Sequence, residues 1–214
     1  MDLEKRIAKE VDELKKFFPK LNHIEKEKRF YKLKGEIEII DPDDGKIWET
    51  YKVEILIKDT YPAELPVLFE KEDKIKHHKN RDGSCCLAPR VEEYLILGRE
   101  FNLCDYLQKL VIPILAAHKL VSLGEEWPNG EYAHEGKGII QYYKGRFETN
   151  EILIILKCLR ILSGKFKINR NKLCLCGSTK KYKFCHGKVL EKFGMINRVV
   201  FQNDLRDIET ELKK

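Results

Sequence analysis

The spacing of hydrophobic residues predicts a helix followed by a β-hairpin in the first part of the chain. Apolar side chains over residues 3–18 fall three or four positions apart, with Lys and Glu between them, which predicts an amphipathic helix that Pro19 ends. Over residues 31–39 the period changes to two, as in a strand with one face in solvent. Turn-forming residues fill 41–45, and the second alternating run at 50–58 completes an antiparallel hairpin.

A bend, a short strand and a loop follow the hairpin. Pro62 and Pro66 bracket the bend, and the apolar residues 67–69 predict a third strand. Residues 74–84 show no periodicity and are expected to form a loop. That loop ends at two consecutive cysteines.

The second half of the sequence is predominantly helical in pattern. An apolar stripe over 103–121 predicts a long helix, which Pro113 is expected to kink because proline lacks a backbone donor. A short helix is expected to begin within 138–143. The apolar segment 152–162 has the length of a helix, although its isoleucines leave a strand possible. Residues 165–214 are basic and end in a charged, helix-like tail.

Composition and charge narrow the class of protein. The 214 residues are 43% hydrophobic and 36% charged, enough for one substantial core and a small appendage. The net charge of +6 comes from 41 basic and 35 acidic residues, which is mild evidence for an acidic partner and weak evidence for nucleic acid. The charged start lacks a secretory signal, and the longest apolar run, 152–156, is too short to span a bilayer. A soluble cytoplasmic protein without membrane partners is expected.

Seven cysteines in a reducing compartment are expected to serve as metal ligands or nucleophiles rather than as disulfides. Cys85 and Cys86 follow Gly83, which lets the backbone approach a bound chain closely. Lysines, histidines and arginines over 76–90 supply cations that favour a thiolate. The alternative is that both cysteines are small buried hydrophobes.

Three stretches, taken with the order of elements, resemble the ubiquitin-conjugating enzyme fold. They are Tyr61-Pro62-Ala63-Glu64-Leu65-Pro66, His78-Lys79-Asn80 and Gly83-Ser84-Cys85-Cys86-Leu87. The resemblance covers roughly residues 1–145 and implies an α+β domain with an N-terminal helix, an antiparallel meander sheet and a long helix.

The same resemblance implies roles for individual residues. Cys86 occupies the position of the thioester nucleophile, and Cys85 that of its apolar neighbour. Asn80 matches the asparagine that supports the oxyanion, and His78 matches the histidine that shapes the loop. The chain departs from the family pattern in having Lys79 in place of proline, and Asn80 lies two residues nearer the cysteine.

The segment 127–136 looks like a recurring stretch of divergent bacterial relatives. Such relatives often sit in anti-phage operons, including those built around a cGAS-like nucleotidyltransferase. Within this segment, His134 lies among glycines and is a candidate for proton transfer to or from the thiol. Its alternative role is to stabilise the loop. His118, within the long helix, is expected to be structural.

A pair of cysteines and a Cys-His pair, separated by a short basic loop, predict a metal site near the C-terminus. Cys174, Cys176, Cys185 and His186 suit tetrahedral zinc in a reducing cell, and four protein ligands would make the site structural rather than catalytic. The run 171–187 resembles the zinc motif at the C-terminus of the SecA translocation motor. That resemblance implies contact with protein or ribosome, while the lysines also suit RNA phosphate.

These observations predict three segments: a ubiquitin-conjugating-enzyme-like domain over 1–145, a connecting helix over 146–164, and a zinc module with a C-terminal helix over 165–214. The expected function is an acyltransferase that carries a ubiquitin-like protein, or another protein's tail, as a thioester on Cys86 and passes it to an amine. No phosphate-binding glycine loop is present, so a separate enzyme must activate the carboxylate. A non-catalytic adaptor and a thiol hydrolase that removes modifiers remain the alternatives.

Overall fold

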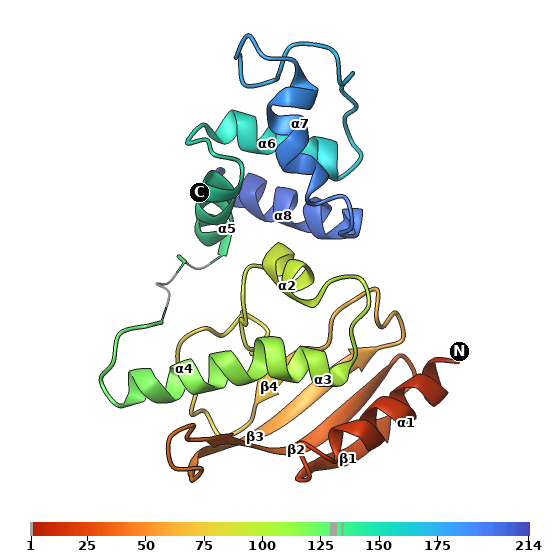
Figure 1. The fold of residues 1–214 in the computed structure, drawn as a ribbon, viewed down its shortest axis with the longest axis vertical. Helices are drawn as coiled ribbons and strands as arrows, with labels where there is room; N and C mark the ends of the chain where they lie inside the picture. Colours follow the sequence, from red (N-terminus) through yellow and green to blue (C-terminus); the bar gives the residue numbers. More distant parts are fainter. Residues whose placement is uncertain (1, 129–131, 134) are drawn as a thin grey trace. The chain divides into compact units, whose positions relative to one another are not determined.

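The structure is a computed structural model that describes residues 2–128, 132–133 and 135–214 (Figure 1). The chain divides into two compact units. The first comprises Met1–Ala88 with Ile96–Gly130, and the second comprises Pro89–Leu95 with Glu131–Lys214. Within the described residues, no helix is both long and apolar enough to cross a membrane.

The first unit places an N-terminal helix before a four-stranded antiparallel meander and a long helical stretch after it (Figure 1). Its elements are α1 (Leu3–Leu14), β1 (Leu21–Lys26), β2 (Phe30–Ile40), β3 (Ile47–Lys58), β4 (Val67–Glu70), α3 (Leu103–Tyr106), a π-helical turn (Leu107–Val111) and α4 (Ile112–Ser122). The strands pair in chain order. The predicted α+β class, with a helix, a meander and a long helix, is confirmed.

Alternation in β2 and β3 divides the sheet into two faces. Leu33, Ile37, Val53 and Ile55 are buried, whereas the lysines and glutamates between them lie on the other face. The long helical stretch covers the buried face, where the Tyr51 hydroxyl donates a hydrogen bond to a carbonyl of α4 at 3.1 Å. Strand β1 was not predicted, because its sequence does not alternate.

A glycine allows β1 to join the sheet. Gly35 pairs with Leu21, and the register shifts by one residue between Leu21 and His23. A Cβ atom on Gly35 would lie 2.1 Å from the Lys20 carbonyl oxygen, and its φ of 153° is one that other residues rarely adopt. Only glycine therefore fits where β1 bends onto β2.

Pro113 does not break the long helix. It lies in the first turn of α4, directly after the π-helical turn, and α3, this turn and α4 follow one another without a loop. Proline has no N–H to donate to the preceding turn, and a wider turn accommodates the missing bond. In place of the expected kink, the structure has a π-helical turn within a continuous helix.

A buried carboxylate joins three segments of the first unit. Glu10 on α1 accepts hydrogen bonds from the Tyr61 hydroxyl at 2.6 Å and from the Leu103 backbone N–H at 2.9 Å, and it forms an ion pair with Arg6 at 2.7 Å. The Tyr61-Pro62 peptide bond is cis. Glu10 thus fixes α1 and the start of α3 against the Tyr-Pro segment.

The second unit is helical. Its elements are part of α2 (Arg90–Leu97), α5 (Glu135–Arg146), α6 (Ile152–Leu162), a 3-10 turn (Tyr182–Phe184), α7 (His186–Glu191) and α8 (Arg198–Glu211). Segment 152–162 is a helix, as its length favoured. Helix α2 was not predicted, although Val91, Tyr94 and Leu95 have helical spacing.

One apolar core connects these helices. Tyr143 of α5 stacks on Phe147, the residue after this helix, at 4.9 Å, and Ile155 of α6 and Phe201 of α8 lie in the same buried cluster. Helix α5 packs against both α6 and α8. Most of α5 lies in the range that the sequence assigned to the first domain, but its aromatic face belongs to this helical core.

The second unit buries one carboxylate beside an arginine. Asp204, which is 3% exposed, pairs with the Arg90 guanidinium at 2.8 Å and accepts a hydrogen bond from the Tyr143 hydroxyl at 2.8 Å. Burial raises the pKa of Asp204 to about 6, outweighing the opposing effects of Arg90 and Tyr143. A buried carboxyl with a pKa above its unfolded value binds its proton more tightly when folded.

Stability of the second unit is therefore expected to fall as pH rises. Between the ordinary pKa of 3.8 and the raised value of about 6, the folded state binds more protons at Asp204 than the unfolded state does. Between pH 4.5 and 7.5, linkage predicts that the titration of Asp204 lowers the free energy of unfolding by about 2 kcal/mol. Urea unfolding followed by circular dichroism would measure the change relative to Asp204→Asn. If the difference in unfolding free energy between wild type and Asp204→Asn did not change with pH, this prediction would be wrong.

Candidate functional site

The two consecutive cysteines close a short hairpin. The Asn80 backbone N–H donates to the Ser84 carbonyl at 2.8 Å, Gly83 turns the chain with a φ of 82°, and Cys85 forms an antiparallel bridge with Lys79. The Cys86 N–H then donates to the His78 carbonyl at 2.6 Å. Backbone hydrogen bonds on both sides of the turn therefore fix the position of the cysteine pair.

Cys85 and Cys86 lie in different environments. Cys85 is 6% exposed, its N–H donates to the Leu68 carbonyl of β4 at 2.7 Å, and burial raises the pKa of its thiol. Cys86 is half-buried. Successive residues of extended chain point to opposite sides, so one thiol packs inward and the other faces outward. Of the two residues, Cys86 is the more exposed.

An aromatic cluster holds the residue whose carbonyl binds Cys86. The His78 imidazole stacks on Trp127 with ring centroids 4.2 Å apart and an interplanar angle of 19°. His118 on α4 contacts both rings edge-on, at 5.6 and 4.9 Å. His78 has a φ of 60°, in the left-handed region that is unfavourable for residues other than glycine. The cluster packs against His78 in this conformation, and its architectural role stays a prediction. The contact between His78 and Trp127 was not predicted, and no spacing in the sequence indicates it.

Asn80 points its amide into the hairpin. Its Nδ2 donates to the Ser84 hydroxyl at 2.9 Å, and that hydroxyl donates to Asp82 at 2.6 Å. The hydrogen bonds from Ser84 hold the pKa of Asp82 below its ordinary value. An amide nitrogen carries two hydrogens, and this bond uses one of them.

The cations expected around the thiol are partly engaged elsewhere. The Lys79 ammonium pairs with Asp73 at 2.8 Å and lies 3.9 Å from Glu70. Arg90 pairs with Asp204 within the second unit. Carboxylates therefore offset two of the cations that the sequence placed near Cys86. His134, the candidate for proton transfer, lies outside the described residues.

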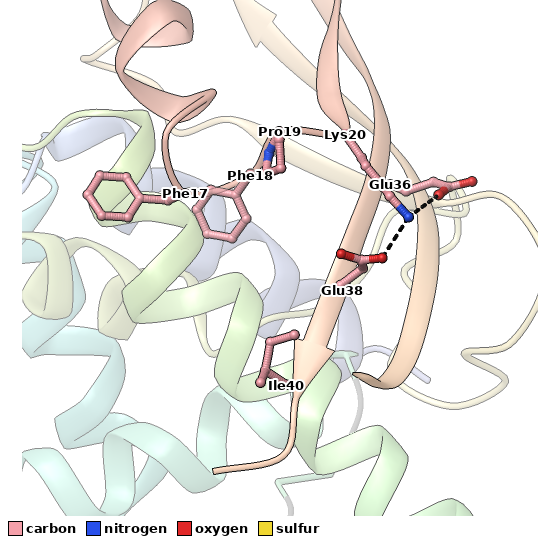
Figure 2. Close-up of a pocket in the computed structure, with 7 residues that line it drawn as sticks. All are labelled: Phe17, Phe18, Pro19, Lys20, Glu36, Glu38 and Ile40. Carbon is pink, nitrogen blue, oxygen red and sulfur yellow. Dashed lines mark hydrogen bonds and ion pairs between the residues drawn. The ribbon is translucent and has the colours of Figure 1, made fainter. Parts of the chain in front are cut away.

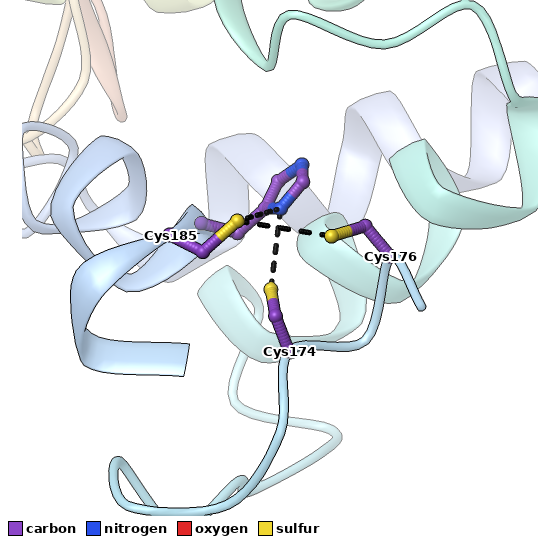
Figure 3. Close-up of side chains that lie close together, drawn as sticks. Cys174, Cys176 and Cys185 are labelled. Carbon is purple, nitrogen blue, oxygen red and sulfur yellow. Dashed lines mark hydrogen bonds between the residues drawn. The ribbon is translucent and has the colours of Figure 1, made fainter. Parts of the chain in front are cut away.

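The four residues of the Cys/His motif converge (Figure 3). Their ligand atoms all lie within 4.8 Å of one another. The His186 Nδ1 is 3.3 Å from the Cys174 sulfur and 3.5 Å from the Cys185 sulfur, and the sulfurs of Cys176 and Cys185 are 3.7 Å apart. Three sulfurs and one imidazole nitrogen can hold a metal ion.

Local backbone structure brings these ligands together. The Gly177 N–H donates to the Cys174 carbonyl at 3.2 Å, and its φ of 78° makes the turn that aligns Cys174 with Cys176. Backbone bonds between 172–174 and 180–182 return the chain to the site. His186 is the first residue of α7. Both ligand pairs thus lie at turns whose backbone geometry the sequence specifies.

Hydrogen bonds lower the pKa of one thiol in the cluster, that of Cys176. Burial works to raise the pKa of Cys176, but hydrogen bonds from the side chain and backbone of Ser178 outweigh it and lower the pKa to about 6. The Ser178 oxygen lies 3.3 Å from the Cys176 sulfur. Metal ligands of this kind bind as thiolates, so a low pKa favours metal binding at neutral pH. Cys158, in the neighbouring core, has its pKa raised to about 12 by burial.

Two surface hollows of the first unit differ in size and shape. One hollow of about 70 Å³ lies beside Lys20, whose ammonium is 2.7 Å from Glu38 and 3.9 Å from Glu36 (Figure 2). Its volume is that of roughly two water molecules, far below that of ligand pockets. A wider groove of about 740 Å³ lies over β1–β3 and is open and charged.

Comparison with known proteins identifies one part of the chain. No solved structure matches it. Residues 170–188 match the family model of the SEC-C motif, and this range contains all four residues of the Cys/His cluster. Residues 170–188 therefore form a SEC-C motif with a cluster that can bind a metal ion.

Proposed function

We propose that this protein is a ubiquitin-conjugating-like acyltransferase that acts in bacterial anti-phage defence. Cys86 carries the carboxyl terminus of a ubiquitin-like protein, or of another protein's tail, as a thioester and transfers it to an amine of a target. The observation that carries the proposal is the cysteine hairpin, which follows a four-stranded meander and presents a half-buried Cys86 beside a buried Cys85.

The proposed reaction has two balanced steps. The Cys86 thiolate attacks an acyl adenylate made by a separate activating enzyme; a C–S bond forms, the acyl C–O bond breaks, and AMP leaves. An amine then attacks the thioester; a C–N bond forms, the C–S bond breaks, the thiol is restored, and the amine loses a proton. Each step passes through an oxyanion, which the free amide hydrogen of Asn80 can stabilise.

Intact-mass analysis tests this function. The wild-type protein is co-expressed with the genes that neighbour its own, including any that encode a nucleotidyltransferase of the cGAS-like type, and is analysed with and without a thiol reductant. We expect a protein-sized adduct that the reductant removes. A stable non-covalent complex without an adduct would favour an adaptor, and release of the modifier to water without conjugation would favour a hydrolase.

Asn80→Ala is expected to slow acyl transfer about 100-fold, the usual cost of losing one oxyanion donor. Ser84→Ala is the matched control, because it breaks the same hydrogen bond at 2.9 Å but keeps the amide. Single-turnover discharge of the thioester to free lysine would measure both rates. Equal losses in the two variants would assign Asn80 a structural role in the hairpin instead.

We infer that the SEC-C cluster holds a structural zinc ion. Tetrahedral zinc with bonds of about 2.3 Å to sulfur and 2.0 Å to nitrogen places sulfurs about 3.8 Å apart and sulfur about 3.5 Å from nitrogen. The corresponding separations here are 3.7 Å and 3.3–3.5 Å. Four protein ligands leave no position open for a substrate. The ion would link the turn at Cys174 to the start of α7.

A further inference from the structure

The positive charge of the chain is concentrated around the SEC-C motif. Residues 165–192, here called the basic segment, hold nine cationic side chains and only one acidic one, Glu191. The nine are Lys165, Lys167, Arg170, Lys172, Lys180, Lys181, Lys183, Lys188 and Lys192. Because the whole chain carries +6 and this segment carries +8, the rest of the sequence has a net charge of −2.

These cations are available to an external partner. All of them are exposed except Lys183, which is half-buried. Among the residues that the structure describes, none of the nine forms an ion pair, whereas lysines of the sheet such as Lys20 and Lys34 pair with glutamates. A cluster of like charges without internal partners is costly, and it attracts a polyanion.

Backbone pairing gathers part of this charge onto a small hairpin. Leu173 and Lys181 form an antiparallel bridge, the Tyr182 N–H donates to the Lys172 carbonyl, and the Lys183 N–H donates to the Arg170 carbonyl. The Cys/His cluster combines Cys174 and Cys176, at the turn of this hairpin, with Cys185 and His186, which follow its second strand. The cations of the hairpin are thus attached to a hydrogen-bonded backbone, unlike those of a disordered tail.

Large apolar side chains are exposed among the same cations. Phe166 is 51% exposed, Leu173 is 66% exposed and Phe184 is 60% exposed. The Lys183 ammonium lies 4.9 Å from the centre of the Phe184 ring. Exposed rings beside unpaired cations are how proteins bind single strands, with cations at phosphates and rings against bases.

We propose that the basic segment binds a single-stranded polynucleotide. Phosphates would contact the hairpin cations, and an unpaired base would stack on Phe184. A duplex offers phosphates but covers its base faces, and an acidic peptide offers carboxylates but no flat ring. This interaction involves no residue of the cysteine hairpin and does not depend on acyl transfer.

Filter binding of the full-length, metal-loaded protein tests the proposal. The probes are oligouridylate, oligothymidylate and an abasic strand, each of about 15 nucleotides, a length suited to one such domain. With about five phosphates contacted, affinity for oligouridylate is expected to fall roughly 100-fold between 50 and 200 mM salt. The abasic strand is expected to bind more weakly than both. Comparison of oligouridylate with oligothymidylate shows whether the surface prefers RNA or DNA.

Charge reversal locates the surface. The triple variant Arg170→Glu, Lys172→Glu and Lys181→Glu is expected to weaken oligouridylate binding at least about 30-fold, because it removes three phosphate contacts and adds repulsion. A control triple variant with the same charge change alters exposed lysines of the first unit that form no ion pair with described residues. Its members are Lys5→Glu, Lys16→Glu and Lys28→Glu. The control is expected to weaken binding less than about threefold. Bound metal, measured in each protein, verifies that the motif is folded.

Phe184→Ala separates base stacking from charge. It is expected to weaken oligouridylate binding about 10-fold and to leave binding of the abasic strand unchanged. No retention of oligouridylate at 50 mM salt, or equal losses in the two triple variants, would overturn the proposal. Equal binding of abasic and base-bearing strands, or stronger binding to anionic vesicles than to either, would assign the surface to a different polyanion.

Discussion

Replacement of Cys86 by serine is expected to lower acyl transfer by roughly 1000-fold or more and to leave a reductant-resistant adduct. A serine hydroxyl is a far weaker nucleophile than a thiolate, so the acyl group loads slowly. Once formed, the oxygen ester resists both thiols and amines and accumulates. Intact-mass analysis of wild type and Cys86→Ser, before and after reduction, measures both effects.

Cys85→Ala is the matched control for this variant. Cys85 is 6% exposed, and its thiol is kept protonated because burial raises its pKa. Its removal is expected to cost some packing energy but to leave the adduct in place. Loss of the adduct in Cys85→Ala, together with its retention in Cys86→Ala, would show that Cys85 is the nucleophile and would overturn this part of the proposal.

Loss of the metal is expected to unfold the SEC-C motif. Cys185→Ser removes the sulfur that lies 3.7 Å from the Cys176 sulfur and 3.5 Å from His186 Nδ1. Because binding free energy in such small sites is also folding free energy, the melting temperature of the second unit is expected to fall by roughly 10 °C or more. Elemental analysis and thermal melts, with and without a strong chelator, measure metal content and stability.

Cys158→Ala separates metal loss from core damage. Cys158 is fully buried on α6 near the motif, but it is not part of the cluster. This variant is expected to destabilise the core while retaining a full complement of metal. If Cys185→Ser kept both its metal and its melting temperature, the four residues would not act as a structural site.

Sequence alone predicted the parts of the fold that depend on local patterns. Strands β2 and β3 were predictable because alternate residues such as Leu33 and Val53 are buried. Strand β1 was not, because Ile24 is 38% exposed and the strand is placed by its pairing with β2. The grouping of α5 with α6 and α8 depends on the packing of Tyr143, which no local pattern reveals.

The candidate sites also combine features that local sequence patterns predict with features that depend on packing. The SEC-C ligands were predictable because all four lie in a short run whose turns are encoded by glycine and serine. The hairpin that brings Cys86 to the His78 carbonyl was not predicted, because residues 74–84 show no periodicity and only a loop was expected there. The stacking of His78 on Trp127 was not predictable, because the two residues are distant in sequence and only the packing of α4 brings their rings together.

The stacking of Trp127 on His78 also gives the cysteine hairpin an optical reporter. Indole emission is quenched by a neighbouring imidazole, most strongly when the imidazole is protonated. Since the His78 carbonyl accepts the hydrogen bond of the Cys86 N–H, the acylation proposed for Cys86 is expected to alter the stacked pair. The other tryptophan of the chain, Trp48, lies on β3. If Cys86 is loaded as proposed, its loading is therefore expected to change the intrinsic fluorescence of the unlabelled chain.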